Sequence, residues 1–259
     1  MTETGCQVER DGDILWIRIN RPQVLNALAP ATHRAMSDAL DAFEADRELR
    51  VAIIIGTGDR AFCVGTDLKV RAETNADDHP PTGFAGLTHR FTLAKPVIAA
   101  VNGLAIGGGV EIVAACDMAV AADHALFSLP EPHVGLAALG GGGLQRLARQ
   151  LPLKFAMEMA LTGRQMSAAE AQAIGLINDV VPAVALKDRV RALAEMIVAG
   201  SPSAIEASKR VMLESLALPN LETALRSRYA AADRMLESDD AKEGQRAFVE
   251  KRKPQWQGR

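Results

Sequence analysis

Apolar runs alternate along the first half of the chain with segments in which apolar residues recur at helical spacing. The strand-like runs cover residues 14–19, 51–55, 97–101 and 118–122. Continuous apolar runs of this length are typical of strands buried on both faces of a parallel sheet. Between the first two runs, Met36, Ala39, Leu40 and Phe43 recur at the spacing of a helix, and Pro30 suits its first turn.

The second half of the chain has a different pattern. From Gly143 onward it predicts helices almost throughout, with Ser201-Pro202 opening one helix and Pro219-Asn220 another. Strand-like segments early and helices late indicate an α/β fold, in which a sheet-containing core is followed by a helical C-terminal region.

Composition and charge narrow the classes of partner. The 259 residues are 48% hydrophobic and 24% charged, with a formal net charge of −3, which is ordinary for one good-sized globular domain. This balance gives no electrostatic reason to expect a nucleic acid or an anionic membrane as partner. The longest apolar stretch, 97–110, is interrupted by Asn102 and glycines and ends at Glu111, so we interpret it as a buried strand and a turn rather than a membrane span.

Cysteine and histidine usage argues against disulfides and metal sites. Cys6, Cys63 and Cys116 are far apart and form no C-x-x-C pair, which indicates reduced thiols. Residues 1–5 are polar and do not form a secretory signal, so we expect a cytoplasmic protein. The five histidines lack the spacing of metal ligands; they are His33, His79, His89, His124 and His133.

The candidate chemistry begins at three consecutive glycines, Gly107 to Gly109. They precede a helical segment, 110–116, and Glu111 lies about one turn inside it. Unpaired N–H groups at a helix start favour negative charge, so this run predicts an oxyanion pocket beside a carboxylate that can move a proton. A glycine-rich turn followed by an ordinary acidic residue is the alternative that these local residues leave open.

Two further segments carry candidate groups. Gly65 permits a tight turn, so the N–H of Thr66 could point into a cavity. Glu131 lies between Pro130 and Pro132 at the end of an apolar stretch, a rigid setting that would raise its pKa as a general acid or base needs. A solvated turn glutamate is the other interpretation of Glu131.

A dinucleotide site and a lid are two further hypotheses. Gly56-x-Gly58-x-x-Ala61 follows a strand, and Asp77 comes 21 residues after Gly56, which is similar to a dinucleotide fingerprint. That motif needs a helix to open at its second glycine, and residues 60–65 show no helical period. The polar, turn-rich segment 74–83 could be a mobile lid or an ordinary surface loop.

Taken together, these segments resemble the signatures of the crotonase family, the enoyl-CoA hydratase/isomerase superfamily. The matching segments are 61–69, 95–103, 107–111 and 129–131, and the ends 21–28 and 240–252 are also similar. The resemblance therefore spans nearly the whole chain in the right order. The C-terminal segment and the glycine-rich stretch are most similar to the carnitinyl-CoA dehydratase (crotonobetainyl-CoA hydratase) branch.

The resemblance implies a spiral of repeated β-β-α units over residues 1–195, which holds the coenzyme A and catalytic sites. Helices in residues 196–259 would then build a homotrimer, often paired into a hexamer. It places the backbone N–H groups of Thr66 and Gly108 in an oxyanion hole and makes Glu111 and Glu131 the catalytic glutamates. The residues it places along the coenzyme A thioester are Val64, Thr66, Asp67, Leu68, Lys69 and Gly108.

The implied reaction is reversible addition of water to the α,β double bond of an acyl-CoA thioester. Two N–H donors stabilise the enolate, and one glutamate takes a proton from water while the other donates one to the α-carbon. No metal or redox cofactor is required, and coenzyme A enters as part of the substrate. Double-bond isomerisation, carnitinyl-CoA dehydration, and a CoA- or RNA-binding role with incidental catalysis are the alternatives.

The sequence departs from the common family pattern in two places. Thr66 stands where many relatives carry alanine, although a backbone donor tolerates this change. The stretch 135–145 is one residue longer than the usual hydratase form, which leaves room for a substrate pocket unlike a straight-chain enoyl site.

Overall fold

Two β-sheets organise the chain in the computed structural model, which describes residues 4–74 and 79–258 except for the side chain of Thr74. The first sheet has the strand order β1 (Cys6–Asp11), β2 (Ile14–Ile19), β3 (Val51–Gly56), β5 (Val97–Val101), β7 (Met118–Ala122) and β10 (Asp179–Val181). The second has the order β4 (Ala61–Cys63), β6 (Leu104–Ile106), β8 (Leu126–Ser128) and β9 (Met166–Ser167).

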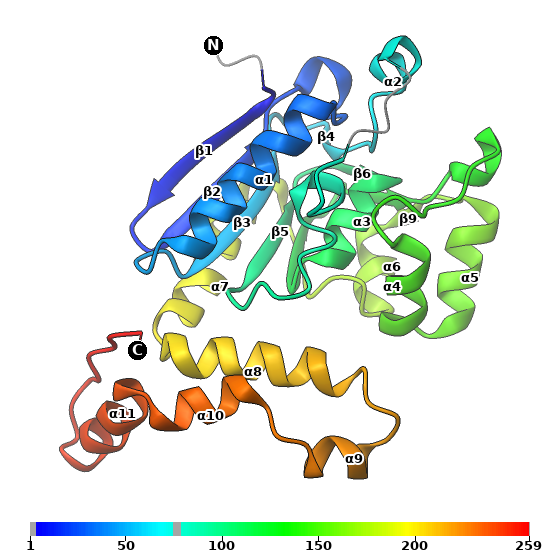
Figure 1. The fold of residues 1–259 in the computed structure, drawn as a ribbon. Helices are drawn as coiled ribbons and strands as arrows, with labels where there is room; N and C mark the ends of the chain where they lie inside the picture. Colours follow the sequence, from blue (N-terminus) through cyan, green and yellow to red (C-terminus); the bar gives the residue numbers. More distant parts are fainter. Residues whose placement is uncertain (1–3, 75–78, 259) are drawn as a thin grey trace.

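Successive turns of the chain supply one strand to each sheet. β3 is followed by β4, β5 by β6 and β7 by β8, and within each sheet these strands pair in parallel. The antiparallel pairs are β1 with β2 and β8 with β9. This progression is the expected spiral of β-β-α units, and it confirms the predicted α/β class (Figure 1).

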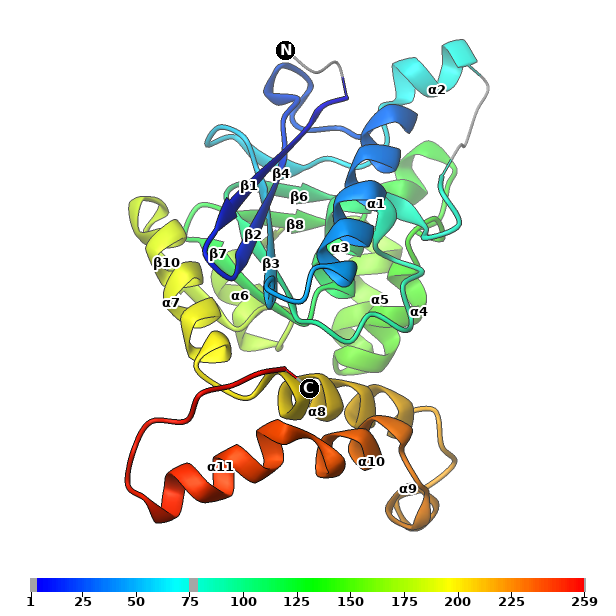
Figure 2. The ribbon, with the colours of Figure 1, turned by 60° about the vertical axis from the view of Figure 1, so that its left-hand side comes forward.

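Helices surround the sheets and form a separate layer at the C-terminal end. The helices are α1 (Pro30–Ala45), α2 (Leu68–Thr74), α3 (Gly108–Ala115), α4 (Gly143–Gln150), α5 (Leu153–Thr162), α6 (Ala168–Ala173), α7 (Leu186–Val198), α8 (Pro202–Ser215), α9 (Leu221–Arg226), α10 (Ala230–Glu237) and α11 (Asp239–Val249). The 3-10 turns are η1 (Pro22–Val24), η2 (Phe84–Gly86), η3 (Glu131–Val134) and η4 (Ala183–Ala185). Both ribbon views show α8 to α11 below the sheets (Figure 2).

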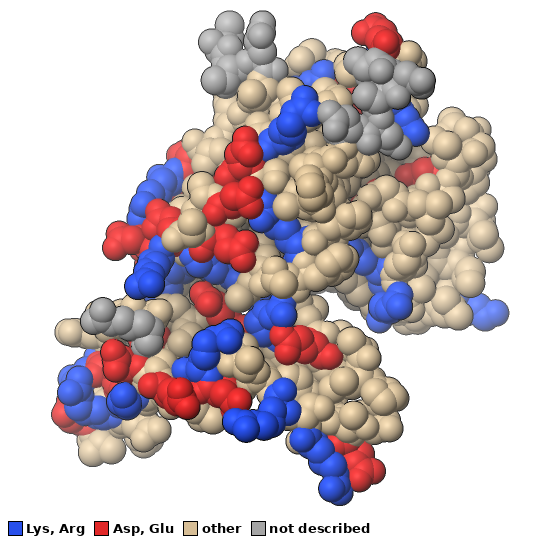
Figure 3. Space-filling view, viewed as in Figure 1, with Lys and Arg blue, Asp and Glu red and all other residues tan. Residues whose placement is uncertain are grey.

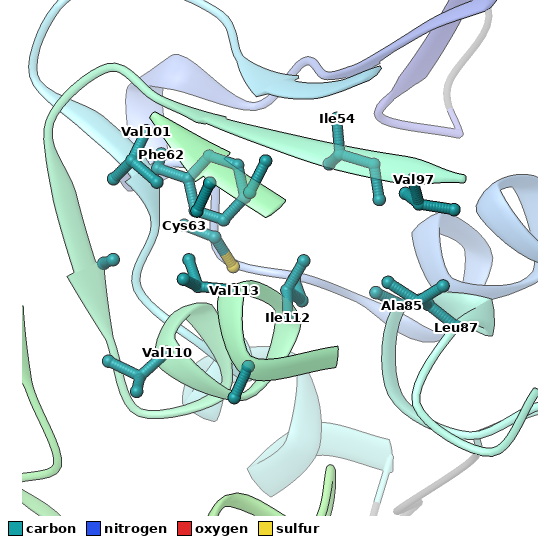
Figure 4. Packing of buried hydrophobic residues seen from close by; sticks show 14 of the residues in the cluster. Ile54, Phe62, Cys63, Ala85, Leu87, Val97, Val101, Val110, Ile112 and Val113 are labelled. Atoms are coloured by element: carbon teal, nitrogen blue, oxygen red, sulfur yellow. The ribbon is translucent and has the colours of Figure 1, made fainter. Parts of the chain in front are cut away.

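The first sheet is buried on both faces, as its apolar runs predicted. Ile54 of β3 points into the larger core, which also contains the inward side chains of α1 and α3. Its neighbour Ile53 points the other way, into a smaller cluster with Leu186 and Val190 of α7. Figure 4 shows the larger core beside α3, where Ile112 and other side chains of this helix lie close to β4. The core therefore fixes α3, and with it the glycine-rich helix start.

Two buried asparagines hold the turn between β3 and β4. Asn26 donates from Nδ2 to the carbonyl of Ala61 at 2.7 Å, and Asn102 accepts from the N–H of Gly56 at 3.0 Å. Ala61–Cys63 is a strand, so no helix opens after Gly58 and the dinucleotide hypothesis is wrong. This turn leads β4 directly into Gly65 and Thr66.

The predicted helix openings are confirmed, whereas the apolar runs did not mark β1, β10 or the four strands of the second sheet. Ser201 caps α8 by accepting from Ala204 N–H, and Asn220 caps α9 by accepting from Thr223 N–H. The prediction of helices almost throughout after Gly143 did not include β9 and β10, which pair with strands of the earlier spiral. β1 is mostly exposed and lacks the apolar run that marked the other strands.

The division at residue 195 stays a prediction, and it falls inside α7. Within the proposed loop 74–83, residues 75–78 lie outside the described residues, so the lid hypothesis also stays a prediction. No helix in the described parts of the chain combines the length and apolar character needed to cross a membrane.

Candidate active site

The start of α3 presents a backbone N–H that no group among the described residues accepts. Gly107 caps the helix with φ +55°, and its own N–H donates to the carbonyl of Ser128 at 2.8 Å. The N–H groups of Val110 and Glu111 both point back to the carbonyl of Gly107, at 2.9 and 3.2 Å. Within residues 4–74 and 79–258, Gly108 N–H has no acceptor. This donor lies at the positive end of the helix dipole.

Each of the three glycines is required by a different close neighbour. An ideal Cβ on Gly107 would lie 2.7 Å from Glu131 Oε1, and one on Gly108 would lie 2.4 Å from Phe84 Cζ. A Cβ on Gly109 would lie 2.0 Å from a carbonyl oxygen of β4. The run thus lets a carboxylate, an aromatic ring and a strand approach the same helix start, which a simple turn would not require.

A second N–H lies close to the first. Gly65 adopts φ +90°, and a Cβ on it would lie 3.1 Å from the nitrogen of Gly108. Leu28 N–H donates to Gly65 O at 2.8 Å, while Asp67 N–H donates to Leu28 O at 2.9 Å. This parallel bridge leaves the N–H of Thr66 on the opposite side, where it has no acceptor among the described residues. Two unused donors therefore start from adjacent backbone segments.

The predicted coenzyme A residues divide into buried and exposed groups. Asp67 is buried, and its Oδ2 pairs with Arg21 Nη2 at 2.8 Å, so this carboxylate holds the backbone bridge together. Leu68 is 56% exposed at the start of α2, Lys69 beside it is exposed, and Val64 is half-buried. The exposed pair lies on the chain directly after Thr66, and a role in binding the nucleotide stays a prediction.

Glu111 is enclosed by the later glycine run. Its side chain is 3% exposed, and its Oε1 accepts from the N–H of Gly143 at 2.9 Å. A Cβ on Gly141 would lie 2.7 Å from Glu111 Cβ, and one on Gly143 would lie 3.0 Å from Glu111 Cγ. The hydrogen bond and the close glycine backbone therefore hold the carboxyl group in one position.

Glu131 has the opposite environment. It opens η3 directly after Pro130, its Oε1 faces Gly107, and its buried Oε2 has no hydrogen-bond partner among the described residues. Burial raises the pKa of this carboxyl above its ordinary value, and the charge of Glu111 raises it further, whereas the backbone N–H of Glu131 lowers it. The shift makes Glu131 easier to protonate than an exposed glutamate, as a proton donor needs.

The raised pKa of Glu131 predicts a pH-dependent gain in stability for Glu131→Gln. In the folded protein the protonated carboxyl is favoured, so its stabilisation is complete below the ordinary pKa of 4.5 and is lost as the pH rises through the folded value. Glutamine cannot ionise, so the variant should unfold at a higher temperature than the wild type at neutral pH. Thermal denaturation followed by circular dichroism should show this difference shrink as the pH falls toward 4.5. A difference independent of pH would contradict the assignment.

Other candidate groups are excluded by their surroundings. Burial raises the pKa of the Cys63 thiol to about 12. The hydrogen bond from Gly65 N–H opposes this rise, and the charge of Glu111 adds a smaller contribution to it. A thiol that stays protonated is a poor nucleophile. In the part of the chain that the structure describes, no group of histidine, cysteine and acidic residues could hold a metal ion.

Sequence reasoning missed three neighbours of this site. Phe84 lies against Gly108, Gly143 binds Glu111, and His79 lies in edge contact with Phe84 at 5.4 Å between ring centroids. The glycine run 140–143 was visible in the sequence, but its contact with Glu111 depends on the packing of α4 against α3. Nothing in the local sequence marks Phe84 or His79.

Comparison with known proteins shows the family to which the chain is similar. The family model described as enoyl-CoA hydratase/isomerase matches residues 9–259. The chain is 44% identical to a protein named carnitinyl-CoA dehydratase from Salmonella paratyphi A, over 98% of this chain and 99% of that protein. A similarly named protein from Salmonella agona has the same identity and coverage.

Solved structures are similar over the whole chain. The structure of an enoyl-CoA hydratase from Mycobacterium tuberculosis H37Rv has a TM-score of 0.93 at 40% identity, covering 99% of this chain and 100% of that one. An enoyl-CoA hydratase from Mycobacterium marinum also has a TM-score of 0.93, at 42% identity and the same coverage.

Proposed function

The chain belongs to the enoyl-CoA hydratase/isomerase family, and from this premise we propose that it adds water reversibly to the α,β double bond of an enoyl-CoA thioester. One observation carries the proposal. The unused N–H groups of Thr66 and Gly108 lie beside two carboxyl groups, that of Glu111, held by Gly143 N–H, and that of Glu131, whose pKa is raised by burial. This combination suits a reaction that needs an oxyanion, a base and an acid together.

The oxyanion hole supports the first part of the reaction. When water adds to the β-carbon, negative charge accumulates on the thioester oxygen. The N–H groups of Thr66 and Gly108 are fixed before the substrate arrives, so they can stabilise this charge without rearranging. The dipole of α3 contributes in the same direction.

The two glutamates divide the proton transfers. Glu111 is held in place by the hydrogen bond from Gly143 N–H, and in this proposal it takes the proton from water as the hydroxyl adds to the β-carbon. Glu131 has a raised pKa and donates its proton to the α-carbon. Dehydration is the reverse, with the two roles exchanged. The balance of atoms requires neither a metal nor a redox cofactor, and coenzyme A enters only as part of the substrate.

A finer candidate for the substrate is carnitinyl-CoA. The relatives named carnitinyl-CoA dehydratase are 44% identical to this chain over almost its whole length, which favours dehydration of a β-hydroxyacyl-CoA with a trimethylammonium head. Isomerisation of a double bond needs only one of the two glutamates, so the presence of both favours hydration over isomerisation.

A turnover screen tests the proposal. Short, long, aromatic and trimethylammonium-bearing enoyl-CoA esters are supplied, and loss of the enoyl-thioester absorbance is followed. We expect hydration of at least one ester and no metal requirement after chelation. If no ester is hydrated while a double-bond shift is observed, the protein is an isomerase and the proposal is wrong.

An RNA-binding role has little electrostatic support. The face drawn in Figure 3 carries intermingled basic and acidic side chains over its charged parts rather than a continuous basic band. The net charge of −3 points the same way. A gel-shift assay at physiological salt should therefore show no RNA complex.

The isolated cysteines support a cytoplasmic location, which we also propose.

We further propose that the protein is a homotrimer or a hexamer. Its C-terminal region exposes many large apolar side chains that a monomer leaves uncovered, among them Met212, Leu213, Leu216, Leu221, Leu225, Leu236, Phe248 and Val249. Apolar surface on this scale is typical of an assembly interface. Sedimentation equilibrium at micromolar concentration should give the mass of three or six chains, and a stable monomer would contradict the proposal.

A further inference from the structure

One glycine of the run 140–143, Gly140, has no close neighbour among the described residues that would require it to be glycine. Gly141 and Gly143 are required because Glu111 occupies the space of their Cβ atoms, and Gly142 is required by its φ of +77°. Gly140 has no positive φ, and a Cβ on it would lie 3.8 Å and 4.0 Å from its nearest neighbours, which are ordinary contact distances. An alanine side chain would therefore fit at this position.

The space beside Gly140 lies between a proposed catalytic group and an aromatic wall. The two neighbours of its Cβ position are His79 Cε1, at 3.8 Å, and Glu111 Oε2, at 4.0 Å. The carboxyl oxygen and the imidazole ring thus both border the space beside Gly140. Gly140 itself is exposed, so this volume is open to a ligand.

Three rings build the wall behind this volume. The rings of His33 and His79 meet edge to face at 4.6 Å between centroids, and His33 meets Phe84 in the same way at 4.6 Å. The ring of His33 is buried, and its Nδ1 accepts from Ala85 N–H at 2.9 Å, which fixes its orientation. Because Phe84 also lies against Gly108, the three rings connect the oxyanion hole with the space beside Gly140.

We propose that Gly140 keeps open the part of the acyl pocket between Glu111 and His79, and that this opening takes a compact trimethyl-substituted head on the γ-carbon of the acyl chain. This inference rests on the proposed function, because Glu111 must lie beside the β-carbon to activate the water that attacks it. The next carbon and its substituent then meet the volume beyond Glu111. A carboxylate on one side and aromatic rings on the other also suit a cationic head.

The variant Gly140→Ala tests the inference against three substrates of graded size and charge. They are crotonyl-CoA, its derivative with trimethylammonium on the γ-carbon, and the neutral derivative with tert-butyl in that place. One added methyl group should lower kcat/KM for both bulky esters by about tenfold or more, and for crotonyl-CoA by less than about threefold. Removing the His79 ring should reverse the effect, so the double variant Gly140→Ala/His79→Ala should regain kcat/KM for both bulky esters.

Two control variants separate this effect from general damage. Gly141→Ala displaces Glu111, so it should lower kcat/KM for all three esters alike. A Cβ on Gly244 of α11 would meet only Trp256 among the described residues, at 3.4 Å, so Gly244→Ala should leave kcat/KM for all three esters unchanged. A uniform loss in Gly140→Ala, or no loss for the bulky esters, would overturn the inference while leaving the proposed function intact.

Binding provides a measurement that does not depend on turnover. Calorimetry with the saturated, unreactive esters butyryl-CoA and its γ-tert-butyl derivative should show weaker binding of only the branched ester to Gly140→Ala, again by about tenfold. Equal dissociation constants for wild type and variant would overturn the inference. If wild type turns over none of the enoyl esters but shows this binding difference, the proposed function fails and the pocket assignment stands.

Discussion

Glutamine in place of either Glu111 or Glu131 is expected to lower the rate of hydration by about two orders of magnitude or more, the range for lost acid–base catalysis. Glutamine keeps the shape of each side chain, and the amide oxygen at position 111 can still accept from Gly143 N–H. The loss should therefore reflect proton transfer rather than a collapsed pocket. Initial rates with the best ester from the turnover screen provide the measurement.

Matched controls make the loss interpretable. Glu48→Gln changes an exposed glutamate and should keep the wild-type rate. Both catalytic-site variants should bind a saturated CoA ester with near wild-type affinity, because neither carboxyl is proposed to hold coenzyme A. The double variant should be little slower than the slower single one, since groups that act in one step are not additive. A near-normal rate in either single variant would remove that glutamate from the mechanism.

The strands at the centre of the spiral could be predicted because burial on both faces requires apolar residues in succession. Residues 51–55 and 97–101 read as strands on that basis alone, and they became β3 and β5. β1 could not be found in this way, since its side chains are mostly exposed and its sequence has no apolar run. β9 and β10 are too short to show a period, and partners distant in sequence determine them.

The same contrast applies to the site. The glycines before Glu111 were informative because all of the relevant residues lie within one helical turn. The raised pKa of Glu131 was foreseen from its prolines and apolar surroundings, and burial is indeed its main cause. The contacts of Glu111 with Gly143 and of Gly108 with Phe84 join segments far apart in the chain, so they follow only from how α3, α4 and η2 pack.

Proline at Gly108 is expected to lower turnover by about two orders of magnitude or more relative to alanine at the same position, the range for loss of one oxyanion donor. Gly108 is the first residue of α3, where the proline backbone is tolerated. Both substitutions place a Cβ where only 2.4 Å separates it from Phe84 Cζ, so both carry this contact, and proline adds its ring atoms. Only proline removes the N–H, so a loss beyond that of alanine that persists when the ring of Phe84 is removed reports the hydrogen bond.

Thr66→Ala completes this comparison, because alanine keeps the backbone N–H and removes only the hydroxyl. It should retain activity within about threefold of wild type and change the preference for acyl groups at most, since the donor that stabilises the oxyanion is unchanged. The Gly108 pair is also made in a Phe84→Ala background, which removes the obstructing ring, and circular dichroism establishes that each variant is folded. If Thr66→Ala were as inactive as a folded Gly108→Pro, the threonine hydroxyl would take part in the reaction. The proposal that the oxyanion hole uses only main-chain donors would then be wrong at Thr66.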